Sequence, residues 1–478
     1  MRAAKIGLLL LILLFGATVE TAWQVRDHIE LGPMGCRVLG GRFYGPSFTF
    51  ESEETQSVPA AAPVEVENAF GSVRVVSGAA GQVTARMRKV VFRPTEAEAR
   101  DFAQRIRLVV TNDGSRLRVE TNRAALETEQ RGRRQVGFET HLELTVPADT
   151  RLVVRNDHGA VTVSDVAEAD LRASFDQVEV ERIAGAVKVD VQHGGAEVRE
   201  AQGPLSITSR HGDVTVQDVK GAVDVQAEHG SISLARVGPA KASTAHGGIR
   251  VDGVTGDLEA RAEHGGVEAS QIAGKAVIEA SYDDIEVRHV DGEARLVAQH
   301  GGVVAEDVQG GVVAESSFDG VRLLRIGKDV QVTVDHGGLE ADDLAGPARV
   351  KVVGDDVTIT GFASSVEVEA DRGSVELTPS GPIAHPLSVR TRHGGITLRV
   401  PAGSGIDVEA ASQHGEMQFD VPGWTQDRVD DARAFGRVGK GGVPVKLDAD
   451  RGDVHVFGAG LPVASASASP SPAPKSDR

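Results

Sequence analysis

The chain has few of the residues that usually hold a compact domain together. It contains one cysteine, Cys36, so no disulfide can form within it. Aromatic residues make up only 4% of its 478 residues, so a core must be aliphatic and thin. Positive charge is outnumbered, since 51 Lys and Arg residues stand against 69 Asp and Glu residues and the net charge is −18 at pH 7. That balance argues against binding DNA or RNA through phosphates and leaves proteins, glycans or cations as partners.

The chain has instead one short pattern, repeated from residue 151 to about residue 378. A ring residue followed by glycine or aspartate returns at intervals of about 18 residues. The ring positions are His158, Phe175, His193, His211, His229, His246, His264, Tyr282, His300, Phe318 and His336, followed by Gly354 without a ring and by Arg372 with a guanidinium. The turn positions are Gly159, Asp176, Gly194, Gly212, Gly230, Gly247, Gly265, Asp283, Gly301, Asp319, Gly337, Asp355 and Gly373. A fixed period of this size is typical of a solenoid, in which each repeat stacks on its neighbours.

Within each repeat the apolar residues alternate with polar ones. In the repeat that starts at His211, the apolar positions are Val214, Val216, Val219, Val223 and Val225, and Gly221 marks the midpoint. This pattern predicts two short strands joined by two turns. We therefore expect an all-β fold, a parallel β-solenoid with coils of about 18 residues, because one coil alone cannot bury enough surface to offset its ordering entropy.

The segments on either side of the regular repeats differ in composition. Residues 1–22 combine a basic start with a short apolar run, which predicts a signal peptide or an uncleaved signal anchor. We expect a linker at 23–63, a small α+β N-terminal cap with one amphipathic helix at 64–150, and regular coils at 151–378. Irregular C-terminal coils and a cap should follow at 379–458, and the Ala/Ser/Pro composition of 459–478 predicts a disordered tail.

The first segment also predicts where the protein works. It implies export, with the protein either anchored in a membrane by its N-terminus or secreted or periplasmic. Contact with the membrane is expected only through that segment. A lipid anchor at Cys36 is a weaker alternative, because the cysteine lies far beyond the apolar run.

The histidine series allows two interpretations. Stacked imidazoles could form a line of metal or proton sites. However, Phe175, Tyr282 and Phe318 occupy the same position and cannot bind a metal as imidazole does. A ladder of rings stacked at one corner explains all of these residues. The glycine or aspartate that follows is explained by a turn with positive φ. We predict no metal site, no cofactor and no catalytic residue.

A group of acidic residues supports a weaker alternative. Asp283, Asp284, Asp319, Asp355 and Asp356 should share one corner on different coils, as the carboxylates of a polysaccharide-active enzyme do. Aspartate is also simply a good turn residue, so an enzyme is the least favoured interpretation.

The order of these motifs resembles a known family. The motifs are Val64-Glu-Val-Glu-Asn-Ala-Phe-Gly-Ser-Val-Arg-Val75, a helix after Pro94, Leu142-Glu-Leu-Thr-Val-Pro147, the repeated ring-Gly-x-Val-x-Val, and a final Arg451-Gly-Asp-Val454. Together they are similar to the bacterial putative-adhesin family of β-strand-repeat envelope proteins, a domain of unknown function. The resemblance covers about residues 64–458 and implies a β-solenoid on an exported or membrane-tethered protein. The family usually carries Asn or Ser before the turn glycine, where this chain has His.

These observations predict an exported, non-enzymatic β-solenoid. Its surface would make adhesion, protein or glycan contacts at the bacterial cell envelope, with a partner that the sequence does not identify. An alternative is an envelope-stress or signalling accessory protein that acts through membrane-proximal partners.

The ladder predicts a dependence of stability on pH. If the histidines are buried in a stack, they should stay neutral in the folded state, whereas the unfolded chain takes up protons below its ordinary pKa of about 6.5. Stability should then fall as the pH is lowered through about 6.5. Thermal melts between about pH 7.5 and pH 5 test this, and a melting temperature that does not change would contradict a buried stack.

Overall fold

The structure is a computed structural model that describes residues 46–57, 63–129, 137–430 and 432–458. The expected signal segment, Cys36, most of the linker and the C-terminal tail lie outside these residues. In the described part of the chain, no helix is both long and apolar enough to cross a membrane.

The chain divides into two compact units. The smaller unit comprises Met1–Phe50, Lys89–Ile106 and Arg123–Glu139, and the larger comprises Glu51–Arg88, Arg107–Asn122 and Thr140–Arg478. We call the larger one the solenoid unit.

The described residues of the smaller unit form two helices, where the sequence predicted one. They are α2 (Glu96–Ala103) and α3 (Arg123–Glu129). As predicted, α2 begins after Thr95, whose hydroxyl accepts a hydrogen bond from the Glu98 N–H at 3.3 Å. Helix α3 was missed because its seven residues are too few to show a periodic apolar face. The guanidinium of its Arg123 is buried and lies 3.8 Å from the centre of the Phe138 ring.

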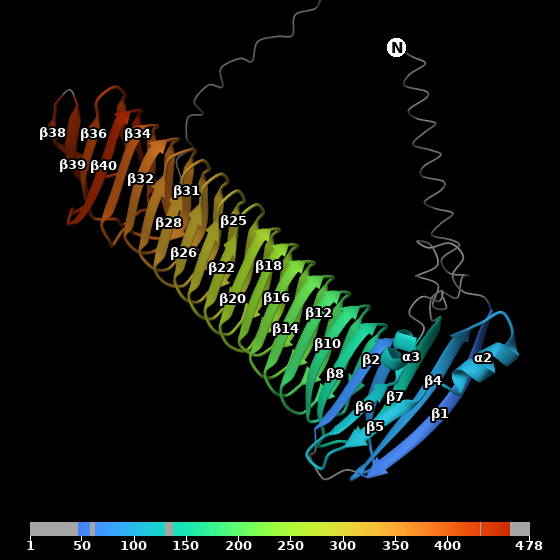
Figure 1. The fold of residues 1–478 in the computed structure, drawn as a ribbon. Helices are drawn as coiled ribbons and strands as arrows, with labels where there is room; N and C mark the ends of the chain where they lie inside the picture. Colours follow the sequence, from blue (N-terminus) through green and yellow to red (C-terminus); the bar gives the residue numbers. More distant parts are fainter. Residues whose placement is uncertain (1–45, 58–62, 130–136, 431, 459–478) are drawn as a thin grey trace, which may run out of the picture. The chain divides into compact units, whose positions relative to one another are not determined.

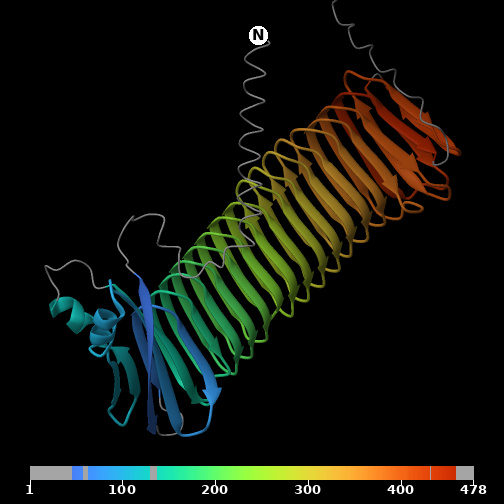
Figure 2. The ribbon, with the colours of Figure 1, turned by 90° about the vertical axis from the view of Figure 1, so that its right-hand side faces the viewer.

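The solenoid unit is a stack of coils, each giving one strand to each of two parallel sheets (Figures 1 and 2). The regular strands of sheet B are β8 (Arg151–His158), β10 (Glu168–Phe175), β12 (Val187–His193), β14 (Leu205–His211), β16 (Val223–His229), β18 (Ala240–His246), β20 (Leu258–His264), β22 (Ala276–Ala280), β24 (Ala294–Ala298), β26 (Val312–Ser316), β28 (Val330–Val334), β30 (Ala348–Val352), β32 (Val366–Arg372) and β34 (Leu387–His393). The regular strands of sheet A are β9 (Val161–Ser164), β11 (Val178–Ile183), β13 (Ala196–Ala201), β15 (Val214–Val219), β17 (Ile232–Val237), β19 (Ile249–Val254), β21 (Val267–Ile272), β23 (Ile285–Val290), β25 (Val303–Val308), β27 (Val321–Ile326), β29 (Leu339–Leu344), β31 (Val357–Phe362), β33 (Val375–Pro379) and β35 (Ile396–Val400). The predicted parallel β-solenoid is confirmed, with about 14 turns.

Neighbouring coils align residue by residue. Leu205 of β14 lies beside Val187 of β12 and Val223 of β16, and the rest of each strand follows the same register. The predicted apolar positions face inward: Val214 and Val216 are fully buried, and Val219 is 1% exposed. Each coil therefore buries its apolar residues between the two sheets and pairs its backbone with the coils on both sides.

The coils at both ends are out of sequence order. The N-terminal strands are β1 (Ser47–Ser57), β2 (Val64–Phe70), β3 (Val73–Gly78), β4 (Gln82–Phe92), β5 (Leu108–Asn112), β6 (Leu117–Thr121) and β7 (Phe138–Pro147). Strand β2 lies between β8 and β6, and β3 lies between β9 and β7. The coil of β6 and β7 is thus outermost although it comes later in the chain. Beyond it in sheet B, β5 pairs antiparallel with β6.

The C-terminal end has the mirrored arrangement. Its strands are β36 (Ile406–Ser412), β37 (Met417–Asp420), β38 (Trp424–Val429), β39 (Arg433–Val438), β40 (Val443–Arg451) and β41 (Val454–Gly458). The last coil, β40 and β41, inserts between the coil of β34 and β35 and the coil of β36 and β37. The β38–β39 hairpin then pairs antiparallel with β36. These antiparallel strands cover parallel edges of sheet B that could otherwise pair with another chain.

A residue with left-handed backbone recurs in sheet A, seven residues after the ring position. Arg182, Asp218 and Arg236 have φ of 54°, 56° and 52°, and the same column contains Gly253 and Gly361. This left-handed residue interrupts the inward-outward alternation of the strand, so Val219 points inward three residues after Val216. A non-glycine residue in this conformation costs about 1–2 kcal/mol, which the pairing of the surrounding strands must offset.

The glycines at the ring corner predict a sharp difference between two adjacent positions. A Cβ on Gly247 would lie 2.2 Å from the carbonyl oxygen of Gly230 in the neighbouring coil, whereas a Cβ on Gly248 would meet nothing closer than 3.5 Å. We expect Gly247→Ala to lower the free energy of unfolding by about 3 kcal/mol. Gly248→Ala should change it by less than about 0.5 kcal/mol. Denaturant unfolding of both variants measures this, and equal effects would contradict the close stacking of the corner.

Candidate functional site

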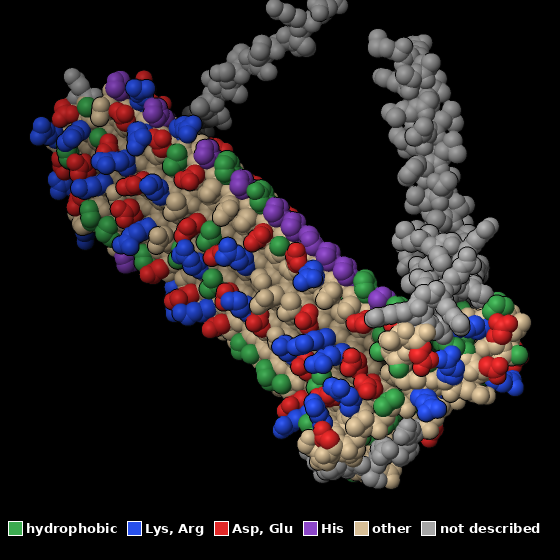
Figure 3. Space-filling model, in the orientation of Figure 1, with side chains coloured by type: hydrophobic (Ala, Val, Ile, Leu, Met, Phe, Trp, Pro, Cys, Tyr) green, Lys and Arg blue, Asp and Glu red, His purple; other side chains and the backbone are tan. Residues whose placement is uncertain are grey.

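The ring residues form one continuous column along a corner of the solenoid unit. The register places each ring position over the next, as with His211 and His229. Adjacent ring centroids are 4.2 Å apart for Phe70 and His158, and 5.2 Å apart for Phe318 and His336, with every other pair in the column between these values. Figure 3 shows the histidines as a line along one edge, interrupted by hydrophobic rings. We call this column, from Phe70 to His336, the ring ladder.

The ring ladder lies on the surface, so the expectation of a buried stack is wrong. The side chains of Phe175, Tyr282 and Phe318 are 41%, 58% and 55% exposed. Each ring residue follows the last inward residue of its strand, where the chain turns outward and the inward alternation ends. Neighbouring rings cover the ring faces, and water reaches the ring edges. The fall in stability with acid that was expected from a buried stack therefore has no basis in this structure.

Several imidazoles are fixed in orientation by the preceding coil. Nδ1 of His264 lies 3.2 Å from the Ala245 carbonyl oxygen, and Nδ1 of His300 lies 2.9 Å from that of Ser281. A carbonyl oxygen only accepts, so Nδ1 donates in the neutral ring and Nε2 keeps its lone pair. Rings stacked in parallel aim these lone pairs in parallel rather than at a common point, as metal coordination requires. Over the described residues, no group of three or more His, Cys, Asp or Glu is arranged to hold a metal ion.

One member of the predicted ladder, Arg372, lies apart from the ring stack. Gly354, which has no side chain, separates it from His336, and Arg372 is aligned with His393 on the following coil. Phe70, which precedes the regular repeats, joins the stack by lying on His158.

The turn after the ring has positive φ in only part of the solenoid. Gly159, Asp176, Gly194, Gly212, Gly230, Gly247, Gly265 and Gly373 have φ between 77° and 157°. The prediction of positive φ is wrong for Asp283, Gly301, Asp319, Gly337 and Asp355, none of which has it. In this stretch the strand ends two residues before the ring position, for example at Ala280. The aspartates then stabilise a different turn, in which Asp283 Oδ1 accepts a hydrogen bond from the Asp284 N–H at 2.9 Å.

The other acidic candidates for an enzyme also bond to backbone. Asp284 Oδ1 accepts from the Gly302 N–H at 2.8 Å, and Asp356 Oδ1 accepts from the Ser374 N–H at 2.6 Å. Asp319 and Asp355 each accept from the N–H of the following residue. These contacts account for the aspartates as turn and inter-coil hydrogen-bond acceptors.

A second column on the surface consists of ion pairs at the left-handed positions of sheet A. Arg236 donates to both carboxylate oxygens of Asp218, at 2.6 and 2.9 Å, and Arg182 pairs in the same way with Asp165. The hydrogen bond from Arg236 holds the pKa of the Asp218 carboxyl below its usual value. Both groups are exposed, so the pairs add little stability. The sequence signal was an Asp followed by an Arg one repeat later, as at Asp165 and Arg182 and at Asp218 and Arg236.

A groove runs across the starts of the sheet B strands, from Arg151 to Val277, and encloses about 1050 Å³. We call it the sheet B groove. Along its middle part the residue that precedes each strand is small, which leaves room for the groove: these residues are Ala186, Pro204, Ala222 and Pro239. Each of these follows a midpoint glycine, and that Gly-Ala or Gly-Pro pair is the sequence signal that could have revealed the groove.

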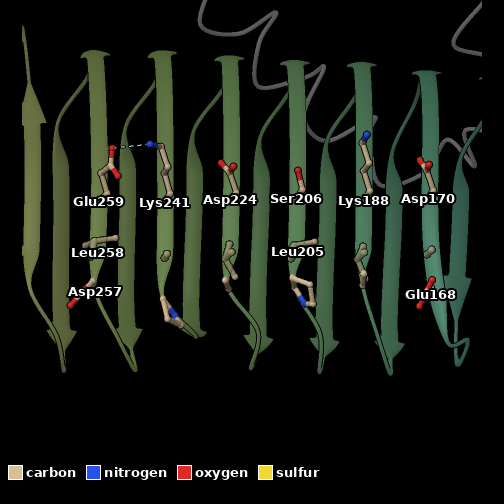
Figure 4. A pocket seen from close by; sticks show the side chains of 18 of the residues that line it. Glu168, Asp170, Lys188, Leu205, Ser206, Asp224, Lys241, Asp257, Leu258 and Glu259 are labelled. Atoms are coloured by element: carbon tan, nitrogen blue, oxygen red, sulfur yellow. Dashed lines mark hydrogen bonds and ion pairs between the residues drawn. The ribbon is translucent and has the colours of Figure 1, made fainter.

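The outward side chains of the same strands form the polar wall of the groove (Figure 4). Asp170, Lys188, Asp224 and Lys241 lie on successive or nearby coils, and Lys241 pairs with Glu259 at 2.9 Å. Oxygen Oδ1 of Asp170 and of Asp224 is buried and finds no hydrogen-bond partner among the residues that the structure describes. Leaving a buried acceptor unpaired costs about 1–3 kcal/mol. A ligand donor that reaches these carboxylates after a small rotation would remove that cost.

Comparison with known proteins gives one family. A sequence profile described as Toastrack DUF4097 matches residues 97–301 and 291–457. A search of curated proteins found no match. Among solved structures, one similar chain is a "putative cell adhesion protein" from Clostridium sporogenes ATCC 15579, at 6% identity and a TM-score of 0.16, with 86% of this chain and 100% of that chain covered.

The ring ladder predicts which substitutions the ring position accepts. His229→Ala removes stacking on His211 and His246, whose ring centroids lie 4.9 and 4.6 Å away. It should lower the free energy of unfolding by about 1–3 kcal/mol, whereas His229→Phe should retain most of the stability. Denaturant unfolding compares the two variants. If both were equally destabilised, the position would need an imidazole rather than a flat ring.

Proposed function

The chain belongs to the Toastrack DUF4097 family, and we propose that it is a non-enzymatic contact scaffold that binds an extended protein or glycan ligand in the sheet B groove. The solenoid unit presents the same few positions again and again at a fixed spacing. Such a surface suits a long ligand better than a small one, because each coil adds an equivalent contact.

The sheet B groove is the observation that carries this proposal. Its volume of about 1050 Å³ is at the upper end of the range for binding clefts. Its floor contains exposed apolar side chains such as those of Pro204 and Pro239. A floor of short side chains lets the backbone or ring of a ligand approach closely.

The wall of the groove indicates the chemistry of the ligand. Both signs of charge are present, from Asp170 and Asp224 to Lys188 and Lys241. The unpaired Oδ1 atoms of the two aspartates can each accept a hydrogen bond from a donor group of the ligand. Hydroxyl groups of a glycan or N–H groups of a polypeptide are such donors, whereas a polyanion would meet repulsion from these carboxylates.

The place of action proposed here is the bacterial cell envelope. The basic and apolar start of the chain supports export, and a rod of about 14 turns at about 4.8 Å each would extend roughly 65 Å. A long, stiff scaffold of this kind holds a contact surface away from its point of attachment.

Filling the groove should abolish the contact. We expect the double variant Ala186→Arg and Ala222→Arg, at exposed floor positions, to reduce retention of protein-coated beads on envelope preparations and on glycan arrays at least about tenfold. The matched control is Thr215→Arg with Thr360→Arg, which adds the same charge at exposed positions of sheet A. Unchanged binding by the groove variant, or equal loss in the control, would contradict the proposal.

A further inference from the structure

The column of corner side chains is interrupted at one coil. The ring ladder runs from Phe70 to His336 with a ring in every coil. The register pairs Val334 with Val352 and Val352 with Ala370, so His336, Gly354 and Arg372 occupy equivalent places on three successive coils. Gly354 therefore leaves an opening in the column, with the face of His336 on one side and Arg372 on the other.

The opening is one ring thick. Successive strands of a sheet lie about 4.8 Å apart, so the equivalent positions of His336 and Arg372 are about 9.6 Å apart. A flat ring placed midway would lie about 4.8 Å from each side. The rings of the ladder itself stack at nearly the same spacing, with Tyr282 and His300 at 4.9 Å and Phe318 and His336 at 5.2 Å.

The opening is a property of the backbone as well as of the side chain. A Cβ built on Gly354 would lie 2.7 Å from the Cα of His336 and 2.8 Å from the nitrogen of Gly337. No other residue fits this backbone without a shift, so the chain cannot fill the opening with a ring of its own.

The two sides of the opening favour an aromatic ring. The ring of His336 is held by a hydrogen bond from Nδ1 to the Ser317 carbonyl oxygen at 3.0 Å, which presents its face to the opening. A guanidinium such as that of Arg372 stacks on the electron-rich face of an aromatic group. The surrounding charges are mainly acidic, with Asp335, Asp355 and Asp356 all exposed, so the ligand should not be an anion.

We propose that the opening between His336 and Arg372 is a binding site for a single flat aromatic ring that is neutral or cationic. The ring belongs to a small aromatic molecule or to a tryptophan or tyrosine side chain of a partner. The site lies at the end of the sheet B strands, whereas the sheet B groove lies at their start, so the two can be tested separately.

The test uses full-length protein with ¹⁵N-labelled histidine side chains and indole as the probe. Indole should shift the imidazole signals of His336, assigned with His336→Gln, and leave those of His211 inside the stack unchanged. Arg372→Ala should weaken binding at least about fivefold, because one side of the site is lost. Adenosine monophosphate, which has a flat ring and a phosphate, should bind at least about tenfold more weakly than indole.

A second variant creates the same opening elsewhere. Phe175→Ala removes the ring between His158 and His193, so it should add a second indole site, seen as new shifts of those two histidines. N-acetyltryptophanamide distinguishes the two possible origins of the ring. If it binds more tightly than indole, the natural ligand is a side chain of a partner protein; if it binds more weakly, the natural ligand is a small molecule. The proposal is overturned if indole leaves His336 unshifted, or if Arg372→Ala leaves the indole affinity unchanged while thermal melts show both proteins folded.

Discussion

Every regular coil of the solenoid unit lies directly over its equivalent in the next coil, and the rest of the structure depends on this register. Backbone hydrogen bonds between parallel strands fix the rise per coil, so any side chain at the corner meets a copy of itself or its substitute. Flat rings suit such a column because they stack at the spacing that the backbone imposes. Glycine is required where a Cβ would meet the neighbouring backbone, as at Gly247. Opposite charges one coil apart, as in Asp218 and Arg236, also follow from it.

The same register explains how a chain with so few aromatic residues builds a recognition surface. A small residue at the start of one strand leaves only a shallow depression. Small residues at every strand start from Ala186 to Pro239 together form a groove. A missing ring in one coil makes a single opening, at Gly354. A feature that every coil repeats becomes an extended surface along the solenoid unit, whereas a residue that breaks the repeat in one coil creates a single site. The proposed ligand-binding groove of this Toastrack protein arises from the repetition, and the proposed aromatic-ring site arises from the exception at Gly354.

The regular coil can be predicted well from the sequence. The places where one coil differs from the next cannot. The period, the two strands and inward residues such as Val214 and Val216 follow from alternation alone, because burial decides them. The exposure of the rings was missed, since a side chain at a turn no longer follows the parity of its strand. The change of turn at Asp283 involves a hydrogen bond within the turn, from the Asp284 N–H to Asp283, and one between coils, from the Gly302 N–H to Asp284. The out-of-order end coils depend on pairings between segments far apart in the chain, for example β2 with β6, which no local pattern encodes.

Contacts between coils hold the strands under the sheet B groove in one rigid register. Hydrogen–deuterium exchange of the full chain, followed by mass spectrometry of peptides, tests this most directly. We expect slow and nearly uniform exchange for the strands from β10 to β22, which have a parallel partner on both sides. Exchange should be faster in the β38–β39 hairpin, where β39 is the one described strand that pairs with β38. Exchange in the groove strands as fast as in that hairpin would show that the coils are not held in a rigid register.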